Sequence, residues 1–205
     1  VESKENGSLN SFIKSNPNKI NDTNKIIIAY GIASALEYLH SHKIVHRNVN
    51  PMNIYLDSNL YPYLSEFQYA IQIETKYHYL LNFSTPGFMP PEFIEDFKLN
   101  QDSFALDVYA YGMTIFTLIN GKNPFIGINQ DEILVKTKEG FHFEFPKNTK
   151  KCWKNLITKC CRFNPSERPS FTEICNEIEN DEFSDEALVN TNDFIQYKKI
   201  INRNH

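Results

Sequence analysis

The 205-residue sequence contains few glycines and cysteines, a single tryptophan and no long apolar run. No stretch approaches the roughly 18 consecutive apolar residues of a membrane-spanning helix, and the first residues have no secretory signal pattern. The net charge of -4 provides no basic face for a nucleic acid. We therefore expect neither a membrane nor a nucleic acid as a partner, and we expect a cytoplasmic protein.

The few cysteines lack the spacing of a metal site. A zinc site would use C-x-x-C pairs or histidines at similar spacing, and neither occurs. Two of the cysteines are adjacent, and the composition is not that of a small secreted domain, which argues against disulfides. We expect reduced thiols in the core at all four positions, which are Cys152, Cys160, Cys161 and Cys175.

What the sequence does have is a globular composition, 41% hydrophobic and 22% charged. Its length suits one large domain or a domain with a tail. Because it begins with Val1, we expect a fragment with sequence missing upstream.

Apolar periodicity predicts a mainly helical fold. Residues 21–41 repeat apolar side chains at helical spacing, with Asp22, Thr23 or Asn24 as the N-cap. Residues 104–119 are apolar nearly all round, as in a central buried helix, and Gly121 suits its C-cap. Further helices are predicted at 8–15, 130–138, 151–161 and 170–180, and a short amphipathic helix carrying Phe194, Tyr197, Ile200 and Ile201 is predicted to dock back.

Between the two long helices the pattern changes. Residues 44–53 are polar and aperiodic, which predicts a loop, and two strand-like pieces at 54–57 and 61–64 predict a hairpin. Residues 66–91 show no period, and such a long stretch inside a domain is usually functional or mobile. The expected fold class is α+β, mainly α-helical, with a small β-hairpin and a long loop.

Six motifs then occur in order over residues 7–175. His46-Arg47-Asn48-Val49-Asn50-Pro51-Met52-Asn53 resembles the protein-kinase catalytic loop His-Arg-Asp-Leu-Lys-Pro-x-Asn, in the required context between a helix and a hairpin. Ser65-Glu66-Phe67-Gln68 is similar to the metal-binding Asp-Phe-Gly of the family, and residues 84–92 are similar to the end of its activation segment. Asp107–Gly112 resembles the motif that opens the family's central helix. Two further family signatures are matched by Gly121–Phe125 and Pro165–Pro169. The chain thus resembles the C-terminal lobe of a protein kinase.

The resemblance implies a domain organisation. Gly7-Ser8-Leu9 resembles the segment after the hinge between the kinase lobes. We therefore expect residues 1–180 to form the hinge and the C-terminal lobe, and residues 181–205 to form a tail that starts with an acidic linker. The N-terminal lobe, which carries the Gly-rich loop, the strand lysine and its glutamate partner, is expected to be absent from this chain.

At the catalytic positions the chain departs from the family. Asn48 stands where the catalytic aspartate is expected, and its neutral amide cannot act as a base. Loss of a general base typically costs about 10²–10⁴-fold in rate. Asn50 stands at the position of the lysine that offsets charge on the transferring phosphate. Both changes indicate impaired catalysis.

The nucleotide and metal positions also differ. By resemblance Asn53 and Glu66 are the metal ligands, but Glu66 is one methylene longer than aspartate, and Mg²⁺ requires tight octahedral geometry. Gln68 replaces a glycine where the activation segment is expected to need φ > 0. Tyr55 replaces the usual leucine under the adenine. We expect this fragment to bind no cofactor strongly, and ATP and Mg²⁺ to bind only if an N-terminal lobe is present.

Several scaffold positions match the family. His46 and Phe67 match its stacked hydrophobic spine, and Asp107 is expected to accept hydrogen bonds from the catalytic-loop backbone. Glu92 and Arg168 match its buried ion pair. By resemblance Arg47 receives a phosphate from the activation segment, whose candidate sites are Thr75, Tyr77, Tyr79, Ser84 and Thr85; unmodified loop hydroxyls are the alternative.

Three functional hypotheses follow. The first is a catalytically impaired pseudokinase that acts in regulation or protein binding, with a protein partner or the missing N-terminal lobe on an apolar face. The second is a fragment of a weakly active, ATP-dependent Ser/Thr or tyrosine-kinase-like enzyme. The third is a truncated product without a role.

Overall fold

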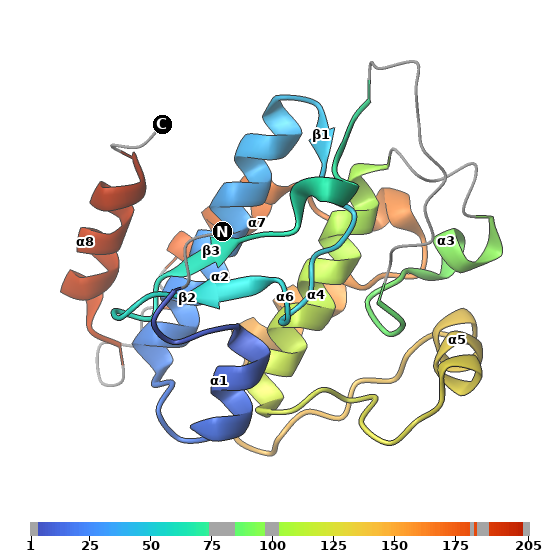
Figure 1. Ribbon diagram of the computed structural model, residues 1–205, viewed down its shortest axis with the longest axis horizontal. Helices are drawn as coiled ribbons and strands as arrows, with labels where there is room; N and C mark the ends of the chain where they lie inside the picture. Colours follow the sequence, from blue (N-terminus) through green and yellow to red (C-terminus); the bar gives the residue numbers. More distant parts are fainter. Residues whose placement is uncertain (1–3, 74–84, 97–102, 181–182, 184–188, 203–205) are drawn as a thin grey trace.

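The computed structural model describes residues 4–73, 85–96, 103–180, 183 and 189–202. Within them the fold is mainly helical with two small sheets, in agreement with the expected class (Figure 1). The elements in chain order are α1 (Leu9–Ser15), α2 (Asp22–Ser41), β1 (Ile44–Val45), β2 (Ile54–Leu56), β3 (Pro62–Leu64), η1 (Phe67–Tyr69), β4 (Ile71–Gln72), α3 (Pro91–Glu95), α4 (Phe104–Asn120), α5 (Gln130–Lys138), α6 (Lys151–Cys160), η2 (Pro165–Glu167), α7 (Phe171–Glu179) and α8 (Thr191–Asn202).

Helices α2 and α4 form the centre of the molecule, and α7 and α8 pack against α2 while α6 packs against α4 (Figure 1). Every residue of α4 from Leu106 to Leu118 is buried, as its uninterrupted apolar sequence predicts. The Tyr111 hydroxyl donates to the Ala29 carbonyl oxygen at 3.1 Å, which ties α4 to the middle of α2.

The ends of the two long helices are capped by local side chains. Gly121 caps α4 with a left-handed backbone at φ 70, as predicted. For α2 the predicted N-cap was wrong by one residue, because Asn21 accepts a hydrogen bond from the Asn24 backbone N–H. The Asn24 side chain in turn accepts from the Asn21 N–H, which completes a capping box.

The predicted hairpin is present, and β2 pairs with β3 with Tyr55 opposite Tyr63. The prediction of an uninterrupted loop over residues 44–53 was wrong, because β1 lies at its start and pairs with β4. These two-residue strands are too short to produce a detectable period, and they form because the chain beyond Phe67 returns alongside the end of α2. Their pairing fixes where the catalytic-loop motif begins.

None of the four cysteines forms a disulfide, and three of them are buried. Burial raises the pKa of the Cys160 thiol at the end of α6 and of the Cys161 thiol at its C-cap. These thiols therefore remain neutral and pack as small apolar side chains. Among the described helices, none is long and apolar enough to cross a bilayer.

Helix α8 docks back onto the lobe through three of its four predicted apolar positions, with Phe194 and Tyr197 buried and Ile201 partly buried against the core. Phe194 packs edge-on against Tyr30 of α2 at 5.2 Å between ring centroids, and Tyr197 contacts Tyr61 beside β3 at 4.7 Å. Ile200, in contrast, is 45% exposed. The buried stripe of α8 is thus narrower than the sequence indicates, and it covers both α2 and the hairpin.

Gly31 permits this docking, and its replacement by alanine should loosen α8. A Cβ atom at position 31 would clash with the Tyr197 hydroxyl and lie 2.6 Å from the Pro62 Cγ atom. Since overpacking typically costs about 1–3 kcal/mol, we expect Gly31→Ala to lower the unfolding free energy and to speed amide hydrogen exchange in α8. Ser34→Ala on the same helix is the control, expected within about 0.5 kcal/mol of the parent. Unchanged exchange in α8 would contradict the packing described here.

Candidate active site

The backbone of the catalytic-loop motif is held by one buried carboxylate, Asp107, near the start of α4. Asp107 Oδ2 accepts from the His46 backbone N–H at 2.8 Å, and Asp107 Oδ1 accepts from the Arg47 backbone N–H at 2.8 Å. His40 on α2 adds a contact at 3.0 Å between its Nε2 and Asp107 Oδ2. Three donors therefore satisfy a carboxylate that is fully buried.

His46 is a buried, neutral histidine. Its Nδ1 accepts from the Asn48 backbone N–H at 3.3 Å, and its Nε2 lies 2.8 Å from the Ser65 carbonyl oxygen. These contacts require a proton on Nε2 alone, and burial lowers the pKa of His46, which favours the same neutral form. Its ring meets Phe67 edge-on at 5.0 Å, although Phe67 is 48% exposed. His46 is thus a packing residue.

Arg47 is buried with a left-handed backbone at φ 65, an uncommon conformation for a residue with a side chain. Its Nε donates to the Tyr69 carbonyl oxygen at 2.7 Å. Burial lowers its pKa to about 10, and nearby Asp107 opposes that shift, so Arg47 remains charged near neutral pH. Four of the five proposed phosphate acceptors, Thr75, Tyr77, Tyr79 and Ser84, lie outside the described residues.

The two substituted catalytic positions contact each other. The Asn50 Nδ2 atom lies 3.1 Å from Asn48 Oδ1 and 3.4 Å from the Thr85 hydroxyl oxygen, and both asparagines are buried. The Asn50 Oδ1 atom accepts from the Met52 backbone N–H at 2.9 Å. Thr85 therefore contacts Asn50, at the lysine position. The cluster is neutral throughout, and none of its side chains can take up a proton near pH 7.

The two expected metal ligands are engaged with protein groups. Asn53 Nδ2 donates to the Asn48 carbonyl oxygen at 2.9 Å, which leaves the Asn53 amide oxygen as its metal donor. Glu66 Oε2 accepts from Gln68 Nε2 at 2.7 Å, which occupies one of the lone pairs of the carboxylate. Within the described part of the chain no three His, Cys, Asp or Glu side chains gather as a metal site. This donor set fits an octahedral Mg²⁺ poorly.

The expectation that position 68 needs a positive φ was wrong. Gln68 lies inside η1, and the left-handed residue is Glu66, with φ 65 and ψ 44. The turn that redirects the chain thus occurs two residues earlier than assumed. Gln68 consequently costs no backbone strain here, and its effect on the site is the hydrogen bond to Glu66.

Tyr55 lies on the outer face of the hairpin. Its neighbours Ile54 and Leu56 are fully buried on the opposite face, because side chains alternate along a strand. Tyr55 is half-buried and pairs across the ladder with Tyr63, which is 43% exposed and carries the Lys4 ammonium 4.0 Å above its ring. The position predicted to lie under an adenine is therefore part of an aromatic surface.

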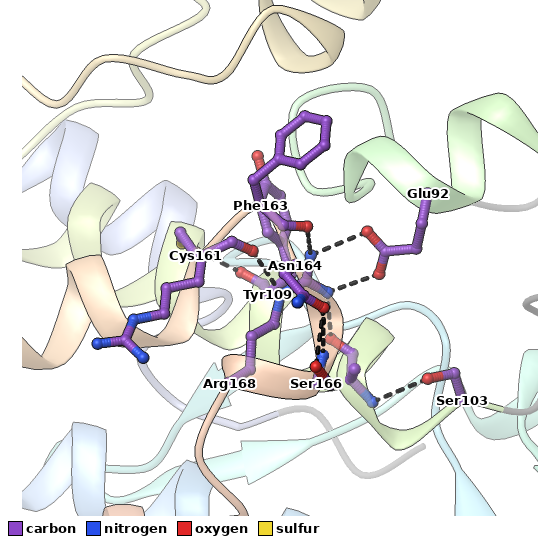
Figure 2. Close-up of polar contacts among 10 residues, drawn as sticks. Glu92, Ser103, Tyr109, Cys161, Phe163, Asn164, Ser166 and Arg168 are labelled. Atoms are coloured by element: carbon purple, nitrogen blue, oxygen red, sulfur yellow. Dashed lines mark hydrogen bonds and ion pairs between the residues drawn. The ribbon is translucent and has the colours of Figure 1, made fainter.

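Glu92 on α3 and Arg168 after η2 form a bidentate ion pair, with Nη1–Oε1 at 2.6 Å and Nη2–Oε2 at 2.8 Å. Figure 2 shows the two parallel contacts and the carbonyl oxygens around the guanidinium. Arg168 also donates to the carbonyl oxygens of Arg162 and Ala105, at 2.8 and 3.0 Å. The Arg168 side chain is fully buried, so this pair fixes the end of the activation-segment motif to the lobe.

The family model for protein tyrosine and serine/threonine kinases matches residues 1–178. The chain belongs to the protein kinase family. Three curated relatives of the kinase domain come from Dictyostelium discoideum. An RGS domain-containing serine/threonine-protein kinase A is 32% identical, and the match covers 85% of this chain and 15% of the relative. A 3-phosphoinositide-dependent protein kinase B is 34% identical, and the match covers 71% of this chain and 16% of the relative. The dual specificity protein kinase pyk3 is 29% identical, and the match covers 84% of this chain and 13% of the relative. The kinase chain thus spans only a small part of each relative.

Sequence reasoning missed His40, which contributes one of the three donors to Asp107. A signal was available, because His40 lies four residues after the fully buried Leu36 and therefore on the same face of α2. A polar residue at such a position needs a buried partner. The kinase motifs themselves gave no indication of it.

Proposed function

We propose that this kinase domain is a catalytically impaired pseudokinase that acts in regulation or protein binding. The observation that carries the proposal is the neutral cluster of Asn48, Asn50 and Thr85 at the position of the catalytic acid and lysine. Transfer of a phosphate to a hydroxyl needs a group that accepts or orients its proton, and loss of that group typically costs about 10²–10⁴-fold. The Asn48 amide, whose oxygen accepts from the Asn50 amide, does not supply it.

Weak nucleotide binding is the second part of the proposal. Tyr55 sets a phenol ring where the family resemblance puts the floor of the adenine pocket. Glu66 is one methylene longer than aspartate and its carboxylate is held by Gln68, which would displace an Mg²⁺ ion that demands near-ideal octahedral geometry. The 205 residues also contain no Gly-rich phosphate loop. ATP and Mg²⁺ would then depend on an N-terminal lobe from elsewhere.

The face around the hairpin and the catalytic loop is the proposed partner surface. Three large apolar side chains there are substantially exposed, Met52 at 40%, Tyr63 at 43% and Phe67 at 48%. Large exposed apolar side chains that gather on one face mark interaction sites. The partner is a protein or an N-terminal kinase lobe, and we place the domain in cytoplasmic signalling.

A second candidate function is weak ATP-dependent Ser/Thr or tyrosine-kinase-like activity within a longer protein. It is favoured by the retained scaffold contacts, since Asp107 still holds the catalytic-loop backbone and Arg168 still pairs with Glu92. The relatives named above are themselves called protein kinases, and the match covers 15% of the first of them. Such activity would require charged groups that the described loop lacks.

The 205-residue chain should show no Mg-ATP-dependent rise in melting temperature. A ligand at 100 times its Kd would add about 2.7 kcal/mol of stability, which corresponds to about 5–11 °C for a domain of this size. Differential scanning fluorimetry with Mg-ATP at millimolar concentration makes the measurement, with Tyr55→Leu as a variant that clears the adenine floor. A clear rise in the parent chain would contradict the proposed loss of nucleotide binding.

Asn48→Asp serves as the matched control, because it restores the acid without changing side-chain size. Its transfer of labelled phosphate from ATP to a generic protein substrate should remain at background. If this single change produced transfer, the missing lobe would be dispensable and the site would be one residue away from activity.

A further inference from the structure

A cavity of about 690 Å³ lies away from the catalytic loop, between the second half of α2, the start of α4 and the start of α7. Its size falls in the range of small-molecule sites. Glu37 and Tyr38 line it from α2, Phe104 lines it from α4, and Phe171 lines it from α7. It therefore combines a carboxylate with aromatic side chains.

Glu37 carries the uncompensated charge of this cavity. In the part of the chain that the structure describes, no lysine or arginine forms an ion pair with it. Its neighbour Cys175 is a neutral thiol, because burial, followed by the nearby carboxylates of Glu37 and Glu179, raises the pKa of Cys175. The nearby Glu179 carboxylate, in contrast, is bound by Lys198 at 3.0 Å.

Two other ionisable side chains that line the cavity, Arg168 and His40, already have partners. Arg168 is held by Glu92 through two hydrogen bonds. His40 contacts Asp107 through its Nε2. The net electrostatic preference of the cavity is therefore set by Glu37 and favours a cation.

The aromatic walls suit the same class of ligand. Tyr38 is 46% exposed, and Phe104 stacks on the His40 ring at 4.3 Å with an interplanar angle of 27°. Phe171 also meets the His40 ring edge-on, at 4.9 Å between ring centroids. Aromatic faces attract cations and also pack against apolar carbon, so an ammonium group joined to an aromatic or aliphatic body matches both features.

The cavity is connected to the catalytic loop by two contacts. His40, which lines it, lies 3.0 Å from Asp107 Oδ2. That same oxygen accepts the His46 backbone N–H, and the second Asp107 oxygen accepts the Arg47 N–H. A ligand against His40 is therefore two hydrogen bonds away from the backbone of the catalytic-loop motif.

We propose that this cavity binds a small organic cation, with its ammonium group on Glu37 and its apolar body against Phe104 and Tyr38. The bound ligand contacts His40 and thereby alters the hydrogen bonds that Asp107 makes to the catalytic loop. The proposal does not depend on whether that loop transfers phosphate.

Three probes that share a phenylethyl body test the charge preference by isothermal titration of the 205-residue chain. They are 2-phenylethylamine, which is protonated at neutral pH, the neutral 2-phenylethanol and the anionic 3-phenylpropionate. We expect the amine to bind most tightly, and Glu37→Gln to weaken it about 10–100-fold, the effect of one charge-assisted hydrogen bond. Glu139→Gln, an exposed site outside the cavity, should change nothing. Equal binding of the alcohol, or no effect of Glu37→Gln, overturns the proposal.

The coupling to the loop is measured by NMR on the same chain. Saturating amine should shift the backbone amide resonances of His46 and Arg47. His40→Phe keeps an aromatic ring against Phe104 but removes the N–H donor to Asp107, so those two shifts should disappear even when the amine saturates the variant. Binding that leaves both amides unshifted in the parent overturns the coupling, and absence of amine binding at millimolar concentration overturns the site. Phe104→Leu, expected to weaken the amine while Glu37 is intact, provides a second test if Glu37→Gln is poorly folded.

Discussion

Replacing Arg168 with alanine is expected to lower the melting temperature by about 6–20 °C. The guanidinium is fully buried and donates to both oxygens of Glu92 and to several carbonyl oxygens. Its removal leaves the Glu92 carboxylate without its cation, and breaking a buried pair in this way costs about 3–5 kcal/mol. A domain of this size loses about 2–4 °C for each kcal/mol. Thermal unfolding followed by circular dichroism makes the measurement.

Arg162→Ala is the matched control, since Arg162 pairs with Glu167 at 3.7 Å but both side chains are about half exposed. An exposed pair contributes about 0–1 kcal/mol, so this variant should melt within a few degrees of the parent. A double-mutant cycle with Glu92→Gln separates the pair from the carbonyl contacts, which Glu92→Gln leaves in place. If Arg168→Ala and Arg162→Ala were equally stable, the pair would not anchor α3 to the lobe.

Asp107→Asn is expected to destabilise the domain by about 3–5 kcal/mol, although it changes a single atom. Two oxygens currently accept three N–H donors, from His46, Arg47 and His40. An amide keeps one oxygen and turns an N–H₂ group toward the remaining donor, so one buried N–H is left without an acceptor and the negative charge is lost. Urea unfolding gives the free energy, with a midpoint shift at constant m-value as the expected signature.

The control for this change is Asp131→Asn on α5, an exposed aspartate that should alter stability by less than about 0.5 kcal/mol. Amide exchange adds a local readout, because the His46 and Arg47 N–H groups should lose protection before the amides of α4 do. Retained protection at both amides would show that the catalytic-loop backbone is held by contacts other than Asp107.

The helices could be predicted from sequence because burial imposes a periodic pattern on them. Residues 104–119 and 170–180 match α4 and α7 to within one residue, since apolar spacing and capping residues agree there. The strand pair β1–β4 could not be predicted, because two-residue strands have no period and depend on a contact between segments about 27 residues apart, joined by Ile44 and Gln72. On α8 the prediction was wrong at Ile200, which is exposed, for the related reason that tertiary packing selects which apolar positions are buried.

At the site, the sequence predicted residue positions better than backbone conformation. The motif spacing places His46, Asp107, Glu92 and Arg168 in the contacts that the resemblance implies. It assigned the positive φ to residue 68, whereas Glu66 adopts it. Side-chain identity alone does not report φ for a residue such as glutamate, because surrounding contacts stabilise the left-handed conformation.

The docking of α8 has a consequence for the order in which this protein folds during synthesis. The Asn190 backbone N–H donates to the Thr23 hydroxyl oxygen across 167 residues of sequence, and Tyr197 closes over Gly31 of the same helix. The α2 face therefore stays uncovered until the residues of α8 have left the ribosome, at about 5–20 residues per second. During that interval an apolar helix face is open to chaperones and to other nascent chains, and such long sequence separations also slow folding itself.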